Sequence, residues 1–362
     1  KLVNGTVAWP NVRTDSTSNS IAARAAELWH GAINGRGKYI PATSGDALVQ
    51  AFRDILVDVI KDTSQPLITV TTSSSTLKAG TLAYVAGYKA ENWAGQLFAR
   101  PLNAVDKTVD IATTWDAAAL LDATTFSVAN RFVLSYDGTK GIPWTTYSQL
   151  PALQQTPLNM NTTTVDNKGQ DRVDYIRGDR TKEQAQSGGI FRDRNSRLGD
   201  VVNSNIWFVG KPASAYSDTA YATFRGTGTG GKGARTPMFY VGSNDGMLHG
   251  VVASDTSTLA GGTELLAYIP QGVAEGDLRK LTDPSYTHQY LVDGSPFSSD
   301  AFISTPLRTT AGWATVLVGT LGLGGKGYFV LDVTDPAEFT TTNVGKLVIL
   351  DKTDKLRGDK DK

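Results

Sequence analysis

Residues 239–253, with the sequence FYVGSNDGMLHGVVA, constrain the fold more than any other part of the chain. Two apolar, β-prone runs flank Asn244, Asp245 and Gly246, and Asp-Gly between such runs is a strong β-hairpin signal. Gly246 readily adopts the positive φ angle that this kind of turn requires. A third apolar segment, residues 264–269, follows a pair of glycines. The pattern therefore predicts a three-strand meander, which is the repeating unit of a β-propeller blade.

The composition of the 362-residue chain suits a large, mainly β fold, because its 37 glycines allow many tight turns. Lysine plus arginine equals aspartate plus glutamate, at 35 each. No net charge is therefore available to attract nucleic acid or an anionic membrane. The absence of cysteine excludes disulfides and cysteine-bound metals. No apolar run approaches the ~18 residues of a transmembrane helix.

Both ends of the sequence indicate an internal part of a longer protein. The start, KLVNGTVAWP, contains neither an initiator methionine nor the apolar core of a signal peptide. Residues 350–362 are mostly charged and are expected to contain no closing strand. We therefore expect the β-propeller in this chain to be incomplete.

Two helices are predicted near the N-terminus, because residues 21–34 and 46–61 carry apolar side chains at helical spacing. His30 lies in the first of them. No second histidine or carboxylate stands at ligand spacing from it, so a structural role is favoured over a catalytic or metal-binding role. We assign residues 1–65 to an N-terminal helical segment and residues 66–362 to an incomplete β-propeller domain.

Strand patterns dominate the rest of the chain, at residues 67–71, 82–88, 96–99, 131–136, 313–318 and 328–333. Residues 115–121 indicate a short amphipathic turn or helix. A strand that ends in Val-Gly recurs at residues 208–210, 240–242 and 317–319. We interpret this recurrence as blades separated by insertions of unequal length. After residue 61 no helix longer than ~11 residues is expected.

Residues 151–200 differ from their surroundings because six arginines alternate with five aspartates between residues 171 and 200. Arginines alone at this density would suggest a phosphate-binding patch. The interleaved aspartates cancel the gain from counterion release, so an ion-paired structural connector is the better interpretation. The two sets are Arg172, Arg177, Arg180, Arg192, Arg194 and Arg197, and Asp171, Asp174, Asp179, Asp193 and Asp200.

Several ordered motifs together resemble the PilC/PilY family of type IV pilus tip proteins. They are LWHGAINGRG at residues 28–37, WAGQL at 93–97, RGDR, FRDR and LGD between 177 and 200, YVGSNDGMLH at 240–249, YTHQYLVDGSP at 286–296 and LDVTDP at 331–336. The resemblance covers residues 29–352. It assigns a structural role to the motif residues Trp29, His30, Arg177, Gly178, Asp179, Asn244, Asp245, Gly246, His249, His288, Asp293, Asp332 and Asp335.

The resemblance implies an exported protein at the tip of a type IV pilus or on the bacterial surface. Its partners would be minor pilins and a host or abiotic surface, and its role would be pilus assembly, twitching motility and adhesion without catalysis. Members of the family carry an aspartate-rich calcium loop further along the propeller, beyond the part that this chain resembles. No cofactor and no small-molecule substrate is therefore expected within this segment, while calcium is expected in the C-terminal part of the parent protein.

Residues that suggest chemistry have a structural interpretation in each case. The glycine-rich run at residues 319–327 precedes a strand, whereas a phosphate-binding loop precedes a helix. The chain has no nucleophile elbow, and we interpret His249 and His288 as hydrogen-bonded blade residues. His288 stands in the sequence close to Tyr286, Tyr290 and Asp293. Arg-Gly-Asp occurs at residues 177–179 and 357–359, but a tripeptide is a weak signal for integrin recognition.

Two alternatives remain open at this point. A quinoprotein dehydrogenase propeller shares the general blade pattern, although residues 266–268 read Leu-Ala-Tyr where its blade signature has Leu-Trp. A generic scaffold propeller would share the architecture without the pilus role, because fold alone does not fix function. Absorbance from a bound cofactor would separate the dehydrogenase from both binding proteins.

Overall fold

The computed structural model describes residues 21–34, 67–72, 82–103, 108–110, 112–161, 164–276 and 278–354. The chain divides into two compact units, Lys1–Thr63 and Ser64–Lys362, and each is described by itself. In the first unit, α1 spans Ile21–Asn34 and confirms the first predicted helix. The second predicted helix, residues 46–61, lies outside the described residues. The proposed domain division at residues 65 and 66 stays a prediction.

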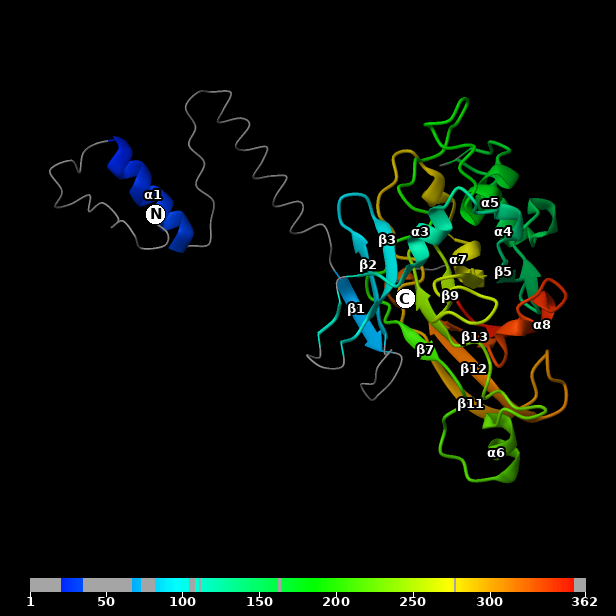
Figure 1. Ribbon diagram of the computed structural model, residues 1–362. Helices are drawn as coiled ribbons and strands as arrows, with labels where there is room; N and C mark the ends of the chain where they lie inside the picture. Colours follow the sequence, from blue (N-terminus) through cyan, green and yellow to red (C-terminus); the bar gives the residue numbers. More distant parts are fainter. Residues whose placement is uncertain are drawn as a thin grey trace, which may run out of the picture. The chain divides into compact units, whose positions relative to one another are not determined.

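The second unit is built on three β-sheets, which Figure 1 shows together with short helices around them. The first sheet is an antiparallel meander of β1 (Leu67–Thr72), β2 (Leu82–Lys89), β3 (Ala94–Pro101) and β4 (Trp115–Asp116). It contains three of the predicted strands. Residues 115–121, expected to form a turn or helix, form β4 and all but the last residue of α3 (Ala117–Asp122). Asp116 caps α3 by accepting a hydrogen bond from the Ala119 amide.

The second sheet contains the predicted hairpin. Its strands, in spatial order, are β6 (Gly141–Pro143), β5 (Val133–Tyr136), β10 (Glu264–Tyr268), β9 (Leu248–Val252), β8 (Met238–Gly242) and β7 (Trp207–Val209). β8 and β9 pair antiparallel, with Val241 opposite His249. The turn glycine, Gly246, has φ +94°, so the predicted conformation is confirmed. β10 then pairs antiparallel with β9 and completes the meander.

Two features of this sheet differ from the sequence expectation. β5 pairs in parallel with β10, which extends the meander by a second hairpin, β5–β6. In addition, two of the three Val-Gly strands, β7 and β8, are neighbours, with Phe208 opposite Phe239. The interpretation of every Val-Gly strand as a separate blade is therefore wrong. A Val-Gly end marks a strand that leaves the sheet at a turn, and two strands of one sheet can end in this way.

The third sheet is a four-stranded antiparallel meander of β11 (Phe297–Ile303), β12 (Gly312–Thr320), β13 (Tyr328–Asp332) and β14 (Val348–Asp351). The glycine-rich run between β12 and β13 holds the short 3₁₀ helix Gly322–Gly324 and is followed by a strand, as expected. β14 corrects the expectation that residues 350–362 contain no strand. Its apolar residues extend to Leu350, and the charged sequence that suggested a loop begins only at Asp351.

The helices after α3 are short. They are α4 (Ala152–Leu158), α5 (Gly169–Arg177), α6 (Thr219–Arg225), α7 (Gln271–Ala274) and α8 (Val344–Leu347). The 3₁₀ helices are Val128–Asn130, Tyr147–Gln149, Leu278–Thr282, Gly322–Gly324 and Pro336–Glu338. In the described part of the second unit no helix exceeds nine residues, which agrees with the expected limit. Within that same part and α1, no helix is long and apolar enough to cross a membrane.

Two apolar cores lie on opposite faces of the second sheet. One contains Tyr84 and Leu97 of the first sheet together with Phe239 and Val241 of β8. The other contains Tyr240 of β8 together with residues of the third sheet, such as Phe329. Because successive side chains of a strand point to opposite faces, β8 contributes to both cores. The second sheet is therefore the middle layer of the unit, and the β8–β9 turn connects two of its interior strands in the region described next.

Candidate functional site

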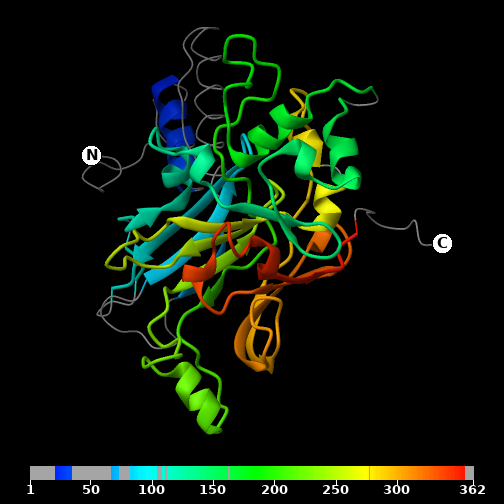
Figure 2. The same cartoon turned by 90° about the vertical axis from the view of Figure 1, so that its right-hand side faces the viewer.

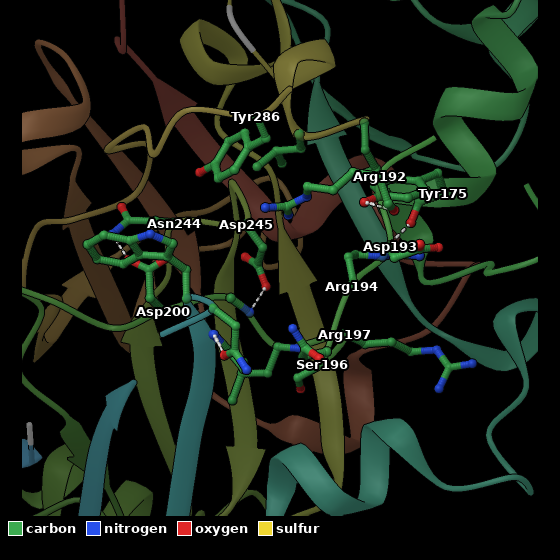
Figure 3. Close-up of a pocket in the computed structure, with 18 residues that line it drawn as sticks. Tyr175, Arg192, Asp193, Arg194, Ser196, Arg197, Asp200, Asn244, Asp245 and Tyr286 are labelled. Atoms are coloured by element: carbon green, nitrogen blue, oxygen red, sulfur yellow. Dashed lines mark hydrogen bonds between the residues drawn. The ribbon is translucent and has the colours of Figure 1, made fainter. Parts of the chain in front are cut away.

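Several of the sequence motifs meet beside the β8–β9 turn (Figure 3). The Gly95 amide donates to the Leu198 carbonyl over 2.9 Å, which joins the WAGQL segment to the LGD segment. The Gly199 amide donates to Asp245 Oδ2 over 2.9 Å, which joins the LGD segment to the turn. We call this meeting point the motif junction, formed by residues 93–95, 198–200, 244–246 and 286–291.

Glycine is required at two positions in the motif junction because backbones approach each other closely there. A Cβ on Gly95 would lie 2.0 Å from the Gly199 carbonyl oxygen, and a Cβ on Gly199 would lie 2.6 Å from the Asp245 nitrogen. Contacts between heavy atoms at such distances are not tolerated when the neighbouring atoms belong to the backbone. The glycines of the WAGQL and LGD motifs therefore serve packing.

Asp200 lies at the centre of the hydrogen bonds in the motif junction. Asn244 Nδ2 donates to Asp200 Oδ2 over 2.7 Å, and His288 Nε2 lies 2.8 Å from the same oxygen. The His288 ring also stacks on Trp93, with ring centroids 3.8 Å apart. Asn244 Oδ1 in turn accepts from the Leu291 amide over 3.0 Å. Two histidine-containing motifs and the LGD segment are thereby connected through one carboxylate.

The carboxylate that faces His288 is therefore Asp200, although Asp293 is nearer in sequence. Asp293 instead accepts two hydrogen bonds from Asn203, one from its amide over 3.1 Å and one from Nδ2 over 2.7 Å. Asp293 is buried and holds the loop before β7. The loop carries His288 and Asp293 to different neighbours, which spacing in the sequence does not reveal.

A row of four charged side chains runs from the turn into the second sheet. Arg131 forms a two-point ion pair with Glu264, at 2.6 and 2.9 Å. Glu264 Oε1 lies 2.7 Å from His249 Nδ1, and His249 Nε2 lies 3.1 Å from Asp245 Oδ2. We call this set the buried charged row. A positively charged His249 donates from both ring nitrogens, so charge alternates along the row.

The buried charged row shifts the pKa values of its members strongly. Burial by itself lowers the pKa of His249, but the charge and hydrogen bonds of Asp245, with those of Glu264, outweigh it and raise this pKa to about 9. Burial raises the pKa of Glu264, but Arg131 and His249 outweigh it and lower this pKa to about 2. The pKa of Asp245 is likewise lowered, mainly by His249 against the effect of burial. The row is therefore fully ionised at neutral pH.

The first Arg-Gly-Asp copy is part of the structure's interior and connector. Arg177, at 7% exposure, donates to the Val128 carbonyl over 2.7 Å. Gly178 ends α5 with φ +111°, a conformation that favours glycine. The carbonyl of Asp179 accepts from Arg194 Nη2 over 2.5 Å. A buried arginine cannot be presented to a receptor. The second copy, at residues 357–359, lies outside the described residues.

The arginines of the connector form ion pairs, as predicted. Their partners, however, are not the aspartates that alternate with them in the sequence. Arg172 pairs with Asp166, Arg194 with Glu183, and Arg180 and Arg197 with Asp122. The Arg192 guanidinium lies over the Tyr286 ring, 4.0 Å from its centroid. In the described part of the chain, no ion pair joins an arginine of the interleaved set to one of its aspartates. The turns of the connector separate residues that alternate in sequence.

Within the second unit, Asp332 and Asp335 lie away from the motif junction. Asp332 accepts from Thr305 Oγ1 over 2.7 Å and from Arg308 Nη1 over 2.6 Å. Asp335 caps the 3₁₀ helix Pro336–Glu338 and pairs with Lys232 at 2.8 Å. Trp29 and His30 lie on α1 in the first unit, where Trp29 is 40% exposed and His30 is half-buried. The structural role given to all of these motif residues stays a prediction.

The cavity at the motif junction has little enclosed space. It measures about 40 Å³, which is room for about one water, whereas ligand pockets span roughly 300–1,000 Å³. Among the residues with described positions, no three histidine, cysteine, aspartate or glutamate side chains come together as metal ligands. The arrangement can therefore lock segments together.

Arg131, Glu264 and Asp200 were not singled out from the sequence, although they hold both networks. Glu264 opens an otherwise apolar strand that pairs with the strand of His249, but the register places Glu264 opposite Val251 and His249 opposite Ala267. Arg131 precedes a strand that joins the sheet in parallel from far away in sequence, and no local pattern indicates that pairing. Asp200 was counted only among the aspartates of the connector.

Comparison with known proteins gives consistent relatives. Residues 198–359 match the family model described as the PilY1 beta-propeller domain. The chain is 39% identical over 93% of its length to the type IV pilus biogenesis factor PilY1 of Pseudomonas aeruginosa strain PAK, of which it covers 28%. It is 31% identical over 84% of its length to a PilY1 homolog of Xylella fastidiosa, of which it covers 23%.

One solved structure also matches. The crystal structure of the Pseudomonas aeruginosa PilY1 C-terminal domain is 34% identical and aligns with 40% of this chain and 25% of that chain. Its TM-score of 0.27 is too low for the superposition to support any structural argument. The similarity to PilY1 therefore rests on the sequence identity and on the family match.

Three packed sheets fastened by a motif junction define a mainly β protein of the β-propeller class, here as an incomplete propeller. The match of residues 198–359 to the PilY1 beta-propeller domain and the similarity to PilY1 proteins confirm the resemblance seen in the motifs. The chain spans 28% of the length of the Pseudomonas aeruginosa PilY1 of strain PAK and 23% of the Xylella fastidiosa homolog.

Proposed function

We propose that this chain is the pilus-anchored propeller segment of a type IV pilus biogenesis factor. In this role the parent protein is exported, sits at the pilus tip and docks on minor pilins. It promotes pilus assembly, twitching motility and adhesion to a host or abiotic surface. The segment acts by binding other proteins and requires no nucleic acid, cofactor or small-molecule substrate, and the calcium site expected in the family belongs to the C-terminal part of the parent protein.

The observation that carries this proposal is the 39% identity to PilY1 over 93% of the chain. The geometry of the motif junction supports it, because the shared motifs there fill space instead of enclosing a substrate cavity. Because these motif residues pack the interior, they maintain the fold and leave its outer surface available for binding other proteins.

A quinoprotein dehydrogenase would need a pocket for a quinone, a calcium site and an aspartate base. The described carboxylates of the motif junction are instead occupied by backbone amides, asparagine and histidine. Turnover of an alcohol or sugar by the purified protein with added quinone would favour the enzyme over the pilus role.

The pilus role is tested in the source bacterium. The coding region for residues 64–362 is deleted in frame from the parent gene, and export of the shortened protein is verified. Surface pili, twitching zones and adhesion are then measured. The matched control is Leu153→Ala, at a position of α4 that is 59% exposed and outside the motif junction. We expect the deletion to reduce piliation and twitching strongly and the control to behave as wild type. Normal piliation, twitching and adhesion in the deletion strain together would defeat the proposal.

A further inference from the structure

The turn between β2 and β3 has a backbone conformation that its sequence does not favour. Trp93 has φ +58°, and among the described residues only Asn167 is another non-glycine with a positive φ angle. Asparagine tolerates this conformation, and glycine is its usual occupant in hairpin loops, whereas a bulky aromatic residue is strained there. A strained residue persists only where the surrounding structure holds it, and such residues are typical of switching segments. The contacts that hold Trp93 therefore indicate what the turn does.

The hydrogen bonds within the turn do not account for a tryptophan at this position. The amides of Asn92 and Trp93 both donate to the Lys89 carbonyl, over 3.3 and 2.8 Å. The Ala94 amide donates to Asn92 Oδ1 over 3.0 Å. All of these bonds involve the backbone or the asparagine, so glycine at position 93 would keep every one of them. The tryptophan is therefore held from outside the turn.

Aromatic stacking supplies that outside contact. The Trp93 ring stacks on Tyr88, with ring centroids 5.1 Å apart, and on His288, with centroids 3.8 Å apart. His288 is itself fixed, because its Nε2 lies 2.8 Å from Asp200 Oδ2 and its ring meets Tyr290 edge-on at 4.9 Å. The stack between two loops that are distant in sequence thus offsets the strain at Trp93.

The same turn closes one side of the cavity at the motif junction. Residues 92–94 and Arg192 both line this cavity. The buried Nε of Arg192 has no hydrogen-bond partner among the described residues, and its guanidinium lies over the Tyr286 ring. Figure 3 shows both side chains beside Asp245. With the turn closed, the enclosed space is about 40 Å³. Movement of Trp93 away from its stacking partner would open this polar space to solvent.

The hairpin below the turn is anchored independently of it. β2 and β3 pair through eight residue pairs, and Tyr84, Ala86 and Leu97 belong to the apolar core between the first and second sheets. Figure 2 shows the first sheet, in blue and cyan, beside the yellow-green strands of the second sheet. Neither Tyr88 nor Trp93 belongs to that core. Segments with few buried apolar contacts open at a lower free energy than the core, so the turn can open while the sheets stay folded.

We infer that residues 89–94 form a strained lid over the motif junction. In the closed state Trp93 keeps its positive φ angle because its ring stacks on His288. In the open state the ring leaves His288, the backbone relaxes to a negative φ angle, and the cavity that Arg192 lines becomes accessible. Loss of one contact releases the strain at the same time, which gives the turn two discrete states. This inference goes beyond the proposed function and does not depend on it.

The test uses the absence of cysteine from the chain. Ala94→Cys places a single thiol in the lid, where the alanine is 7% exposed, and Ala86→Cys places one in the core of the same hairpin, where the alanine is 0% exposed. A small thiol reagent reacts only when the cysteine becomes exposed, so its rate measures opening at each position. Without denaturant we expect Ala94→Cys to react about a hundredfold faster than Ala86→Cys or more, because only the latter requires global unfolding.

Two replacements of Trp93, each combined with Ala94→Cys, separate strain from stacking. Trp93→Ala removes the ring and keeps a side chain at positive φ, whereas Trp93→Gly removes both the ring and the strain. We expect the alanine variant to react about threefold faster than the glycine variant. His288→Ala should also raise the rate, and adding it to Trp93→Ala should raise it no further, because both remove the same stack. Leu153→Ala, outside the motif junction, should leave the rate unchanged.

Each possible result decides the inference. Equal reaction rates of Ala94→Cys and Ala86→Cys overturn the lid, because the turn then opens only with the whole fold. Equal rates for the alanine and glycine variants of Trp93 overturn the strain, and additive effects of Trp93→Ala and His288→Ala overturn the shared stack. If a cysteine variant does not fold, hydrogen exchange of the wild type decides: the amides of residues 92–93 and 289–291 must exchange together and before those of β8 and β9. None of these measurements involves a pilin, so a failure here leaves the pilus role standing.

Discussion

Asp245 links three parts of the molecule through one carboxylate. It accepts hydrogen bonds from the Gly199 amide of the connector and the Met247 amide of its own turn. It also faces His249, the third member of the buried charged row. Asp245, which the sequence identifies as a turn residue, thus also holds the connector against the second sheet. Substitutions in this turn are therefore expected to act beyond the hairpin.

Gly246→Val is expected to lower the free energy of unfolding by about 2 kcal/mol, because valine is strained at a positive φ angle. In addition, a Cβ at this position would lie 2.4 Å from Leu278 Cδ1. The control is Gly312→Val, where a Cβ would have no heavy atom within 4 Å, and the expected change is within about 0.5 kcal/mol. Urea denaturation measures both. Equal stability of the two variants would contradict the turn geometry.

The buried charged row predicts a pH window of greatest stability. The folded pKa of His249, about 9, lies above its ordinary value of 6.5, so this contribution is complete below pH 6.5 and is lost as pH rises through 9. The folded pKa of Glu264, about 2, lies below its ordinary value of 4.5, so this contribution is complete above pH 4.5 and is lost as pH falls through 2. The two contributions are therefore largest together between pH 4.5 and 6.5.

His249→Gln isolates the first of these effects. At pH 6 the variant should be less stable than the wild type by about 3 kcal/mol, since it breaks a buried ionic network. The difference between the two proteins should shrink as pH rises towards 9 and above. Chemical denaturation at a series of pH values gives both curves, and a difference that stays constant with pH would show that His249 is not held in its charged form.

At the scale of elements, arginines hold the irregular connector between α5 and β7. Arg194 donates to the Tyr175 carbonyl over 2.6 Å and pairs with Glu183 at 2.8 Å. Its guanidinium also lies 3.6 Å from the centroid of the Tyr175 ring. The connector has few apolar side chains, so the arginine guanidinium groups, which are planar and carry several N–H donors, hold its conformation.

Arg194→Lys should therefore be costly although it keeps the charge. A lysine can replace one of these contacts but not the stacked and forked arrangement, so we expect a loss of about 2 kcal/mol in unfolding free energy. Arg225→Lys, at an exposed position in the last turn of α6, is the control and should change stability by less than about 0.5 kcal/mol. A similar, small effect at both positions would show that the connector does not depend on the fork of Arg194.

The elements that were predictable are those with local signals. The β8–β9 hairpin follows from Asp245-Gly246 between apolar runs, and α1 follows from helical spacing. The parallel partner of β10 was not predictable, because nothing near Val133 or in residues 264–269 specifies a strand so distant in sequence. The same reason applies to the motif junction: its residue types were visible, but the pairing of His288 with Asp200 depends on how loops fold back. Ion-pair partners in the connector were missed because turns decide which charges meet.

At the scale of the whole second unit, the second sheet packs against an apolar core on each of its two faces. One core joins it to the first sheet through Tyr84 and Phe239, whose ring centroids are 5.2 Å apart. The other joins it to the third sheet through Tyr268 and Phe329, at 5.0 Å. Neither outer sheet has a large core of its own in the described residues. Loss of the middle sheet therefore removes the packing of both neighbours.

This arrangement predicts that the three sheets unfold in one cooperative transition. Hydrogen exchange measured by mass spectrometry at increasing urea should show the β2–β3, β8–β9 and β12–β13 segments losing protection at the same concentration. Because the reason is the shared cores, Phe239→Ala should shift all three midpoints together. Separate midpoints for the first and third sheets, or a shift confined to the first sheet, would contradict the prediction.

The parallel pairing of β5 with β10 also links the order of folding to the order of synthesis. Val133 pairs with Ala267, so their residue numbers differ by 134. Contacts between such distant residues form slowly, because a long loop must close first. A chain that emerges from its N-terminus therefore carries β5 with an unpaired edge until β10 has appeared. During that interval the β5 edge is exposed to pairing with other chains. The β5 edge therefore needs protection from aggregation only before residue 268 emerges, because β10 covers this edge in the folded protein.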